Sequence, residues 1–291
     1  MDLDVISRHR IVGVDKERKW TMKGILTVLS FACLISATYC QTHLTGKDIY
    51  RTNCGAIVQI FAGNELGVGF ITSADGQIMT ANHVVATPQS GFRQYAEQIQ
   101  VKVAGRSVSV VAKPINEAPS QDQINYDSAV IKITATGLPH VTLGDWKGVD
   151  IGDTVTILPT FPGFGCMLLQ GTVAGKGPLT TVLGPRPVNT IIFQAPIRNG
   201  FSGSPIFGKD GRVIGIEDTK VFGISPALGA LRDQWQSTTQ NGQIRMFGID
   251  IAGSFLQTIN NLDQNLISGL GSGVAIEYAK DLAAGGAGPH K

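Results

Sequence analysis

Metal-binding residues are scarce in this chain of 291 residues, which holds four cysteines and five histidines. They form no Cys/His cluster with metal-ligand spacing, so we expect neither a metal nor a cofactor. Aromatic residues make up only 7% of the sequence, whereas there are 36 glycines and hydrophobic residues reach 43%. This composition is typical of a globular, turn-rich protein and excludes a disordered one.

The chain also lacks a charge excess of either sign. It contains 24 basic and 22 acidic residues. Residues 1–40 hold six of the basic and four of the acidic residues, which leaves eighteen of each sign in residues 41–291. A protein that binds nucleic acid carries a basic surface, so we expect no nucleic-acid partner.

No apolar run in the N-terminal region reaches the ~20 residues that a membrane-spanning helix usually needs. Residues 22–40 instead have the form of a secretory signal peptide, with Lys23 before an apolar core from Ile25 to Ala37. We expect cleavage before Gln41, or after Ala37, and a secreted or periplasmic mature chain without a membrane span. A signal anchor is the less favoured alternative. Residues 1–21 are a charged extension or a mis-assigned start.

Two cysteines remain after cleavage before Gln41, namely Cys54 and Cys166. An oxidising compartment permits a disulfide between them. Two buried, reduced thiols that behave as small hydrophobic residues are the alternative. The sequence leaves both possibilities open.

From about residue 54 onward, the sequence consists of short apolar runs separated by turn signals. Many short strands at near-regular spacing are typical of an all-β sandwich or barrel. The runs are Ala56–Phe61, Val68–Thr72, Ile99–Val103, Val108–Ala112, Ala129–Ile133, Val155–Leu158, Met167–Val173, Thr190–Phe193, Ile206–Phe207 and Val213–Ile216.

A serine flanked by glycines lies between two of these runs, in the stretch Gly200-Phe201-Ser202-Gly203-Ser204-Pro205. Glycine permits backbone angles that other residues resist, so the amides of Gly200 and Ser202 can converge beside the hydroxyl of Ser202. That is the geometry of an oxyanion hole beside its nucleophile. Turns of this composition are common without catalysis, and the interpretation depends on two upstream residues.

His83 and Asp127 supply the chemistry that a serine nucleophile lacks. A serine hydroxyl needs an adjacent base, and the base needs a group that fixes its tautomer. His83 can accept the proton of Ser202, and Asp127 can hold the other ring nitrogen of His83.

Several short motifs follow one another in an order that identifies a family. In this sequence they are Gly67–Thr72, Asp75–Val85, Asp127–Ile133, Leu143–Asp145, Ile151–Asp153, Gly200–Pro205, Gly211–Ile216 and Gly273–Ile276. Together they span roughly residues 50 to 284. The chain resembles a trypsin-like (chymotrypsin-fold) serine peptidase, and within that group the bacterial HtrA/Deg type. The order His, Asp, Ser is also the order found on that fold.

The resemblance implies two antiparallel six-stranded β-barrels with the active site in the cleft between them. Residues 50–145 would form the first barrel with His83 and Asp127, and residues 146–285 the second barrel with Ser202. A short C-terminal helix over residues 279–284 and a flexible tail over residues 286–291 would follow. We expect no PDZ domain.

The segment 217–268 is longer than the corresponding connection in the family, and we interpret it as an insert. A helix opened by Ser254 would present Leu256, Ile259, Leu262 and Leu266 on one face. We expect this helix to pack on the second barrel, with a lid or exosite as the less favoured alternative.

The function implied by the resemblance is that of a serine endopeptidase acting on proteins or peptides through an acyl-enzyme. Pro196 stands six residues before Ser202, where enzymes that cleave after Arg or Lys carry an acidic residue. Ile214 and Ile216 would line the substrate pocket and favour small or medium aliphatic P1 side chains. The alternative is a catalytically silent binding or scaffold protein, and a single-target protease is a third possibility.

Overall fold

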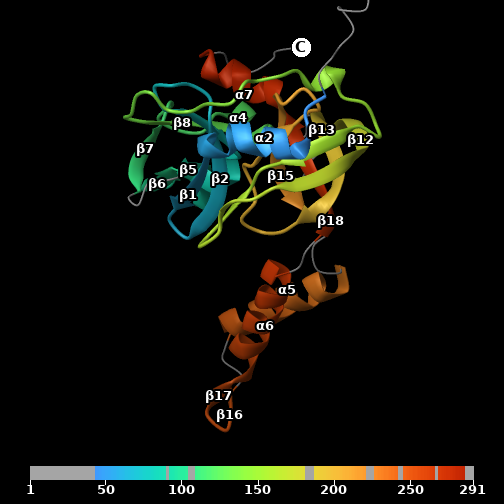
Figure 1. The fold of residues 1–291 in the computed structure, drawn as a ribbon. Coiled ribbons are helices and arrows are strands. Elements are labelled where there is room, and N and C mark those ends of the chain that lie inside the picture. The colour runs from blue at the N-terminus through green and yellow to red at the C-terminus, as the bar shows by residue number, and fades with distance from the viewer. Residues whose placement is uncertain are drawn as a thin grey trace, which may run out of the picture. The chain divides into compact units, whose positions relative to one another are not determined.

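The computed structural model describes residues 43–89, 92–103, 109–180, 187–220, 226–241, 245–265 and 268–285. The predicted signal peptide, the extension before it and the predicted tail lie outside these ranges. Within them, the strands form two closed barrels and three two-stranded sheets (Figure 1). The predicted all-β class with two six-stranded antiparallel barrels is therefore confirmed.

The first barrel holds residues far apart in sequence side by side. Its strands, in order around the barrel, are β1 (Ile57–Ala62), β2 (Glu65–Ile71), β3 (Gln77–Thr80), β8 (Ala129–Ile133), β7 (Val110–Pro114) and β6 (Ile99–Val103). In β6 buried and exposed residues alternate strictly, as expected for a strand with one face on the core. The pairing of β3 with β8 brings Thr80 opposite Ala129, and this places the segments of His83 and Asp127 at one barrel end.

The second barrel has the order β12 (Leu169–Thr180), β13 (Pro187–Ile197), β18 (Ser268–Ala275), β15 (Val213–Lys220), β14 (Pro205–Phe207) and β9 (Thr154–Ile157). Phe193 and Phe207 are fully buried in its core. The remaining short strands pair as β4 (Ala86–Gln89) with β5 (Phe92–Tyr95), and β10 (Thr160–Phe161) with β11 (Gly165–Cys166). Ser202 lies in the turn that joins β13 to β14.

Short helices occupy the ends of the barrels. They are α2 (Gly46–Asn53), η1 (Cys54–Ala56), α3 (Asn82–Val85), α4 (Gln121–Asn125), η2 (Trp146–Gly148) and α7 (Ile276–Ala283). The sequence reasoning missed α2, whose start carries a capping box between Thr45 and Asp48. The C-terminal helix α7 begins at Ile276, three residues before the predicted start at Ala279. None of the helices in the described part of the chain is long and apolar enough to cross a membrane.

The insert forms two helices, α5 (Pro226–Asn241) and α6 (Ile251–Asn265), with the strands β16 (Arg245–Met246) and β17 (Ile249–Asp250) between them. The prediction that Ser254 opens the second helix is wrong. The Asp250 carboxylate accepts a hydrogen bond of 2.9 Å from the Gly253 amide, so the cap lies four residues before Ser254.

The predicted apolar face of α6 is only partly buried. Ile259 is 2% exposed, whereas Leu262 is 56% exposed, and Leu266 lies outside the described residues. Trp235 of α5 packs against Phe255 of α6 with ring centroids 5.3 Å apart. The two helices of the insert therefore contact each other, and a role of the insert as a lid or exosite stays a prediction.

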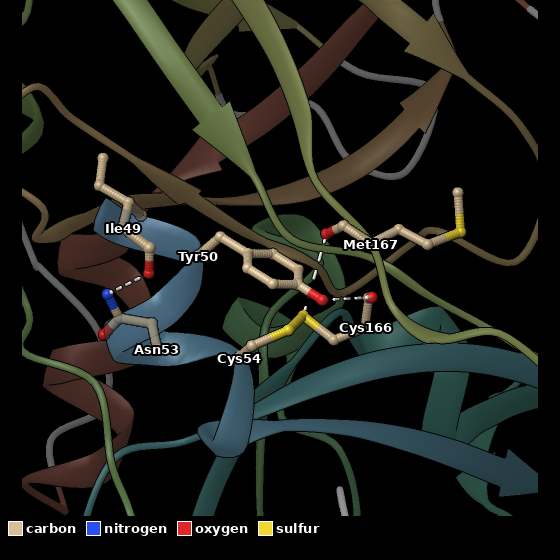
Figure 2. Close-up of a disulfide and its surroundings, with 6 residues drawn as sticks. All are labelled: Ile49, Tyr50, Asn53, Cys54, Cys166 and Met167. Carbon is tan, nitrogen blue, oxygen red and sulfur yellow. Dashed lines mark hydrogen bonds between the residues drawn. A yellow bond between two sulfur atoms is a disulfide. The ribbon is translucent and has the colours of Figure 1, made fainter. Parts of the chain in front are cut away.

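A disulfide joins Cys54 to Cys166, across 112 residues of sequence (Figure 2). Cys54 lies in η1, directly before the first barrel, and Cys166 ends β11, directly before the second barrel's β12. Of the two alternatives that the sequence left open, the structure shows the disulfide. Figure 2 also shows the Tyr50 hydroxyl pointing at the Cys166 carbonyl oxygen, 3.4 Å away.

Candidate active site

His83 and Asp127 are held together by two hydrogen bonds. The His83 ring nitrogen Nδ1 lies 2.5 Å from Oδ2 of Asp127, and the His83 main-chain N–H donates to Oδ1 at 2.9 Å. Because the carboxylate accepts at Nδ1, the proton of a neutral imidazole sits on Nδ1. The other ring nitrogen, Nε2, then carries the lone pair that can accept a proton. The structure thus places the two side chains in hydrogen-bonding contact, and their catalytic roles stay a prediction.

Local structure explains how the two side chains reach this position. His83 lies in the single helical turn α3, which follows β3 directly, and the preceding residue Asn82 donates its amide to the Asp127 carbonyl at 3.1 Å. Asp127 follows α4, which is capped by Ser120. Asp127 has a positive φ of 43°, a conformation that aspartate tolerates better than most residues. This backbone angle aims its carboxylate at α3.

Burial and charge oppose each other at Asp127, whose side chain is 2% exposed. Burial alone would raise the pKa of Asp127, but the positive charge of His83 and hydrogen bonds from His83 and Asp218 hold this pKa at about 2. Asp127 is therefore an anion at neutral pH. A fixed anion at Nδ1 stabilises the imidazolium that forms when His83 accepts a proton.

The serine turn is shaped by two glycines with positive φ, Gly200 and Gly203, both at 89°. Phe201 anchors the turn and is 3% exposed. The turn is closed by a hydrogen bond from the Ser204 amide to the Phe201 carbonyl at 3.0 Å. Among the hydrogen bonds of the described residues, the amides of Gly200 and Ser202 are not donors.

The two barrels meet at this turn. The amide of Val68, on β2 of the first barrel, donates to the Ser202 carbonyl at 2.8 Å. A Cβ atom at Gly67 would lie 2.5 Å from a methyl group of Val84 and 3.0 Å from the Ser202 carbonyl oxygen. The serine turn and the helix that carries His83 thus pack on the same glycine.

The hydroxyl of Ser202 donates to the main-chain carbonyl of Asp218 at 3.0 Å. The side chain of the same residue faces the histidine, because Oδ1 of Asp218 lies 3.8 Å from His83 Nδ1. His83, Asp127 and Asp218 each place one polar atom within 4.8 Å of the others. Asp218 thus contacts all three residues of the predicted triad.

A further acidic residue, Glu217, is buried beside this group. Its side chain is 1% exposed, and among the described residues neither carboxyl oxygen has a hydrogen-bond partner. Burial raises the pKa of Glu217 to about 8; the positive charge of His83 opposes this rise and the charge of Asp127 adds to it. Glu217 is therefore protonated at pH 7, because a buried carboxylate without a partner is costly.

The sequence reasoning missed Glu217 and Asp218. Two adjacent acidic residues directly after the apolar run Val213–Ile216 were the available signal, since charged residues are rarely placed at the buried end of a strand. Their proximity to His83 depends on the closure of the second barrel and is not visible in the sequence.

The residues predicted to form the substrate pocket lie in different surroundings. Pro196 is exposed on β13. Ile214 and Ile216 are 2% and 0% exposed and belong to the hydrophobic core. The nearest side-chain atom of Ile214 lies 3.3 Å from the position that a Cβ at Gly208 would occupy. A role of these three residues in binding the P1 side chain stays a prediction.

The fold and the site together define a class of protein, the two-barrel serine peptidases, with an Asp–His pair on one barrel and a serine turn on the other. The model of the trypsin-like peptidase domain matches residues 67–216, just over half of the sequence. The chain belongs to this family.

Among curated relatives, probable periplasmic serine endoproteases of the DegP-like type from Pseudomonas putida and Pseudomonas fulva are 34% and 36% identical over 157 residues. These residues are 54% of this chain and 29% of each relative, so the match spans less than a third of their length.

The solved structures of the HtrA-type protease AlgW with a tripeptide and with a decapeptide align with TM-scores of 0.57 and 0.56. The alignments cover 83% of this chain, and 63% and 67% of AlgW, at 22% and 18% identity. At this identity the likeness shows the fold alone.

Proposed function

We propose that this chain is a serine endopeptidase of the HtrA/DegP kind that hydrolyses peptide bonds through Ser202, His83 and Asp127. The observation that supports this most is the hydrogen-bonded pair of His83 and Asp127 beside a glycine-flanked serine turn, on a fold of the same family. The relatives named as serine endoproteases support the reaction class.

In this mechanism the Ser202 oxygen attacks the carbonyl carbon of the peptide bond and its proton passes to Nε2 of His83. The carbonyl oxygen becomes negative and accepts hydrogen bonds from the amides of Gly200 and Ser202. His83 then gives the proton to the leaving amine, and the C–N bond breaks. Water, activated by the same nitrogen, releases the acyl group from Ser202.

The Ser202 hydroxyl turns from Asp218 to His83 during this cycle. Its hydrogen bond to the Asp218 carbonyl is one staggered position of a freely rotating side chain. In peptidases without a ligand the bond between nucleophile and base is often not formed until substrate binds. A substrate in the cleft would displace the hydroxyl from the carbonyl.

We propose an aliphatic preference at P1, because Pro196 occupies the position of the acidic residue that would hold Arg or Lys. The test is a series of peptide substrates that differ only in P1. We expect faster cleavage after Val or Ala than after Arg, and preferred cleavage after Arg would overturn the preference.

We also propose that the mature chain acts outside the cytoplasm, in the periplasm or as a secreted protein. The disulfide supports this location, because structural disulfides persist in oxidising compartments. The word "periplasmic" in the names of the DegP-like relatives agrees with it. A signal sequence over residues 22–40 would direct the export.

The deciding experiment is labelling with a fluorophosphonate probe, which reacts only with an activated serine. We expect the wild-type protein to be labelled and to hydrolyse casein. Ser202→Ala should abolish labelling and reduce turnover by about 10⁴-fold or more. Ser237→Ala is the matched control, because Ser237 is an exposed serine on α5.

Each outcome separates the two functional classes. Labelling that persists in Ser202→Ala would remove Ser202 from the mechanism. A folded wild-type protein that is never labelled would favour the alternative, a silent binding or scaffold protein with the peptidase fold. Labelling without casein hydrolysis would indicate a protease with a single target.

A further inference from the structure

Asp218 places a second carboxyl group at the histidine. Its side chain is 13% exposed, and Oδ1 lies 3.8 Å from His83 Nδ1, whereas Asp127 lies 2.5 Å from the same nitrogen. Asp218 belongs to β15 of the second barrel, so the two aspartates approach His83 from different barrels. The shorter distance identifies Asp127 as the partner of the ring, and Asp218 needs another role.

Hydrogen bonding indicates which of the two aspartates holds a proton. One carboxyl oxygen of Asp218 lies within 4.8 Å of one of Asp127, and the side chain of Asp218 lowers the pKa of Asp127 as a hydrogen-bond donor would. Two ionised carboxylates have no hydrogen to share, so one member of such a pair must be protonated. Both oxygens of Asp127 already accept from His83, one from the ring and one from the main chain. The proton of the pair therefore sits on Asp218.

We propose that Asp218 acts as a protonated positioning residue, whose carboxylic acid donates to Asp127, and that loss of its proton at alkaline pH lowers catalytic activity. The inference rests on the proposed function, because Asp218 acts through the Asp127–His83 pair and not on the substrate. Asp218 donates this hydrogen bond only while it holds its proton. A neutral donor in the same place would donate at every pH.

Deprotonation of Asp218 would have two physical effects. The two carboxylates would repel each other, which loosens the orientation of Asp127. The hydrogen bond that Asp218 donates to Asp127 would also be lost, so one of the contacts that hold the Asp127 carboxylate at Nδ1 of His83 would disappear. The titratable groups that face Asp218 from the described residues are His83 of α3 and Asp127 before β8, and Glu217 is its neighbour on β15.

The test compares pH profiles of kcat/KM from pH 5 to 10 with a small peptide substrate. We expect the wild-type activity to fall on the alkaline side. In Asp218→Asn the amide donates to Asp127 at every pH, so near-wild-type activity at pH 7 and no alkaline fall are expected. Asp218→Ala lacks the donor, and its kcat/KM should be about tenfold lower than that of the wild type at all pH values. Asp218→Ser replaces the Asn variant if that variant does not fold.

Glu217→Gln is the matched control, because Glu217 is a buried carboxyl next to Asp218 on β15. An alkaline fall that is identical in the wild type and Asp218→Asn would overturn the proposal. So would a fall that disappears in Glu217→Gln.

A second measurement does not depend on turnover. The infrared difference spectrum between the wild type and Asp218→Asn at neutral pH should contain the band of one protonated carboxylic acid, and its absence would overturn the proposal. If the protein proves to be a silent binding protein, the proposed function fails in the fluorophosphonate experiment, while this spectrum still decides where the proton lies.

Discussion

Glu217 is a buried acid, and the free energy that its burial costs the folded protein depends on pH. It is 1% exposed, has no hydrogen-bond partner in the part of the chain that the structure describes, and lies beside Asp127, so burial raises its pKa to about 8 from an ordinary value of 4.5. Below pH 4.5 the folded and unfolded chains both hold its proton. Between about 4.5 and 8 only the folded chain does, so the free energy of unfolding falls as the pH rises.

We predict that Glu217→Gln removes this dependence. Glutamine keeps the shape of the neutral acid and has no proton to lose. The free energy of unfolding of the wild type, relative to the variant, should decrease by a few kcal/mol between pH 4.5 and 8 and level off above pH 8. Urea denaturation at a series of pH values measures it, and parallel curves for the two proteins would contradict the prediction.

The turn between β13 and β14 is the element on which the site depends most closely. Gly203 has a φ of 89°, and a Cβ at this position would overlap the Val68 carbonyl oxygen and the Thr80 hydroxyl. These two groups are hydrogen-bonded to each other at 2.6 Å. The turn thus sits directly on β2 and β3 of the first barrel, and only a residue without a side chain fits there.

For this turn we expect Gly203→Ala to destabilise the protein by about 2 kcal/mol or more, from the backbone conformation and from overpacking. The control is Gly152→Ala, because Gly152 has a φ of 93° with nothing within 4 Å of the added Cβ. This variant should lose only about 1 kcal/mol of unfolding free energy. Urea unfolding and fluorophosphonate labelling provide the measurements. Equal losses in the two variants would show that close approach to the first barrel is unimportant.

The disulfide acts at the scale of the whole molecule. Cys54 and Cys166 lie 112 residues apart in sequence, Cys54 just before β1 of the first barrel and Cys166 between β9 and β12 of the second (Figure 2). Closing a long loop removes conformations from the unfolded chain more effectively than closing a short one. The candidate active site lies where the barrels meet, so we expect a covalent link between them to support the site as well.

The double variant Cys54→Ser, Cys166→Ser should lose about 2–5 kcal/mol of unfolding free energy. Reduction of the wild type with dithiothreitol should cause a loss of the same size, whereas the double variant should not respond to the reductant. Thermal and urea unfolding with and without dithiothreitol test this. A wild type that is indifferent to reduction, with its thiols shown to be free, would contradict the prediction.

The sequence predicted the strands from its apolar runs, and the two-barrel fold and the Ser–His–Asp candidates from motifs that resemble a known family. Short alternating apolar runs indicate strands because a half-buried strand repeats every two residues, and the motifs around His83, Asp127 and Ser202 are local in sequence. The start of α6 was placed wrongly at Ser254, because its cap comes from Asp250, and α2 was missed altogether.

The contacts around these residues became visible in the tertiary structure alone. The choice between a disulfide and two free thiols required the approach of η1 to β11. Glu217 and Asp218 reach His83 only after the second barrel closes against the first, since the contacts join segments more than 130 residues apart. Contacts across such sequence distances depend on barrel closure and core packing, so they cannot be predicted from the pattern of residues along the chain.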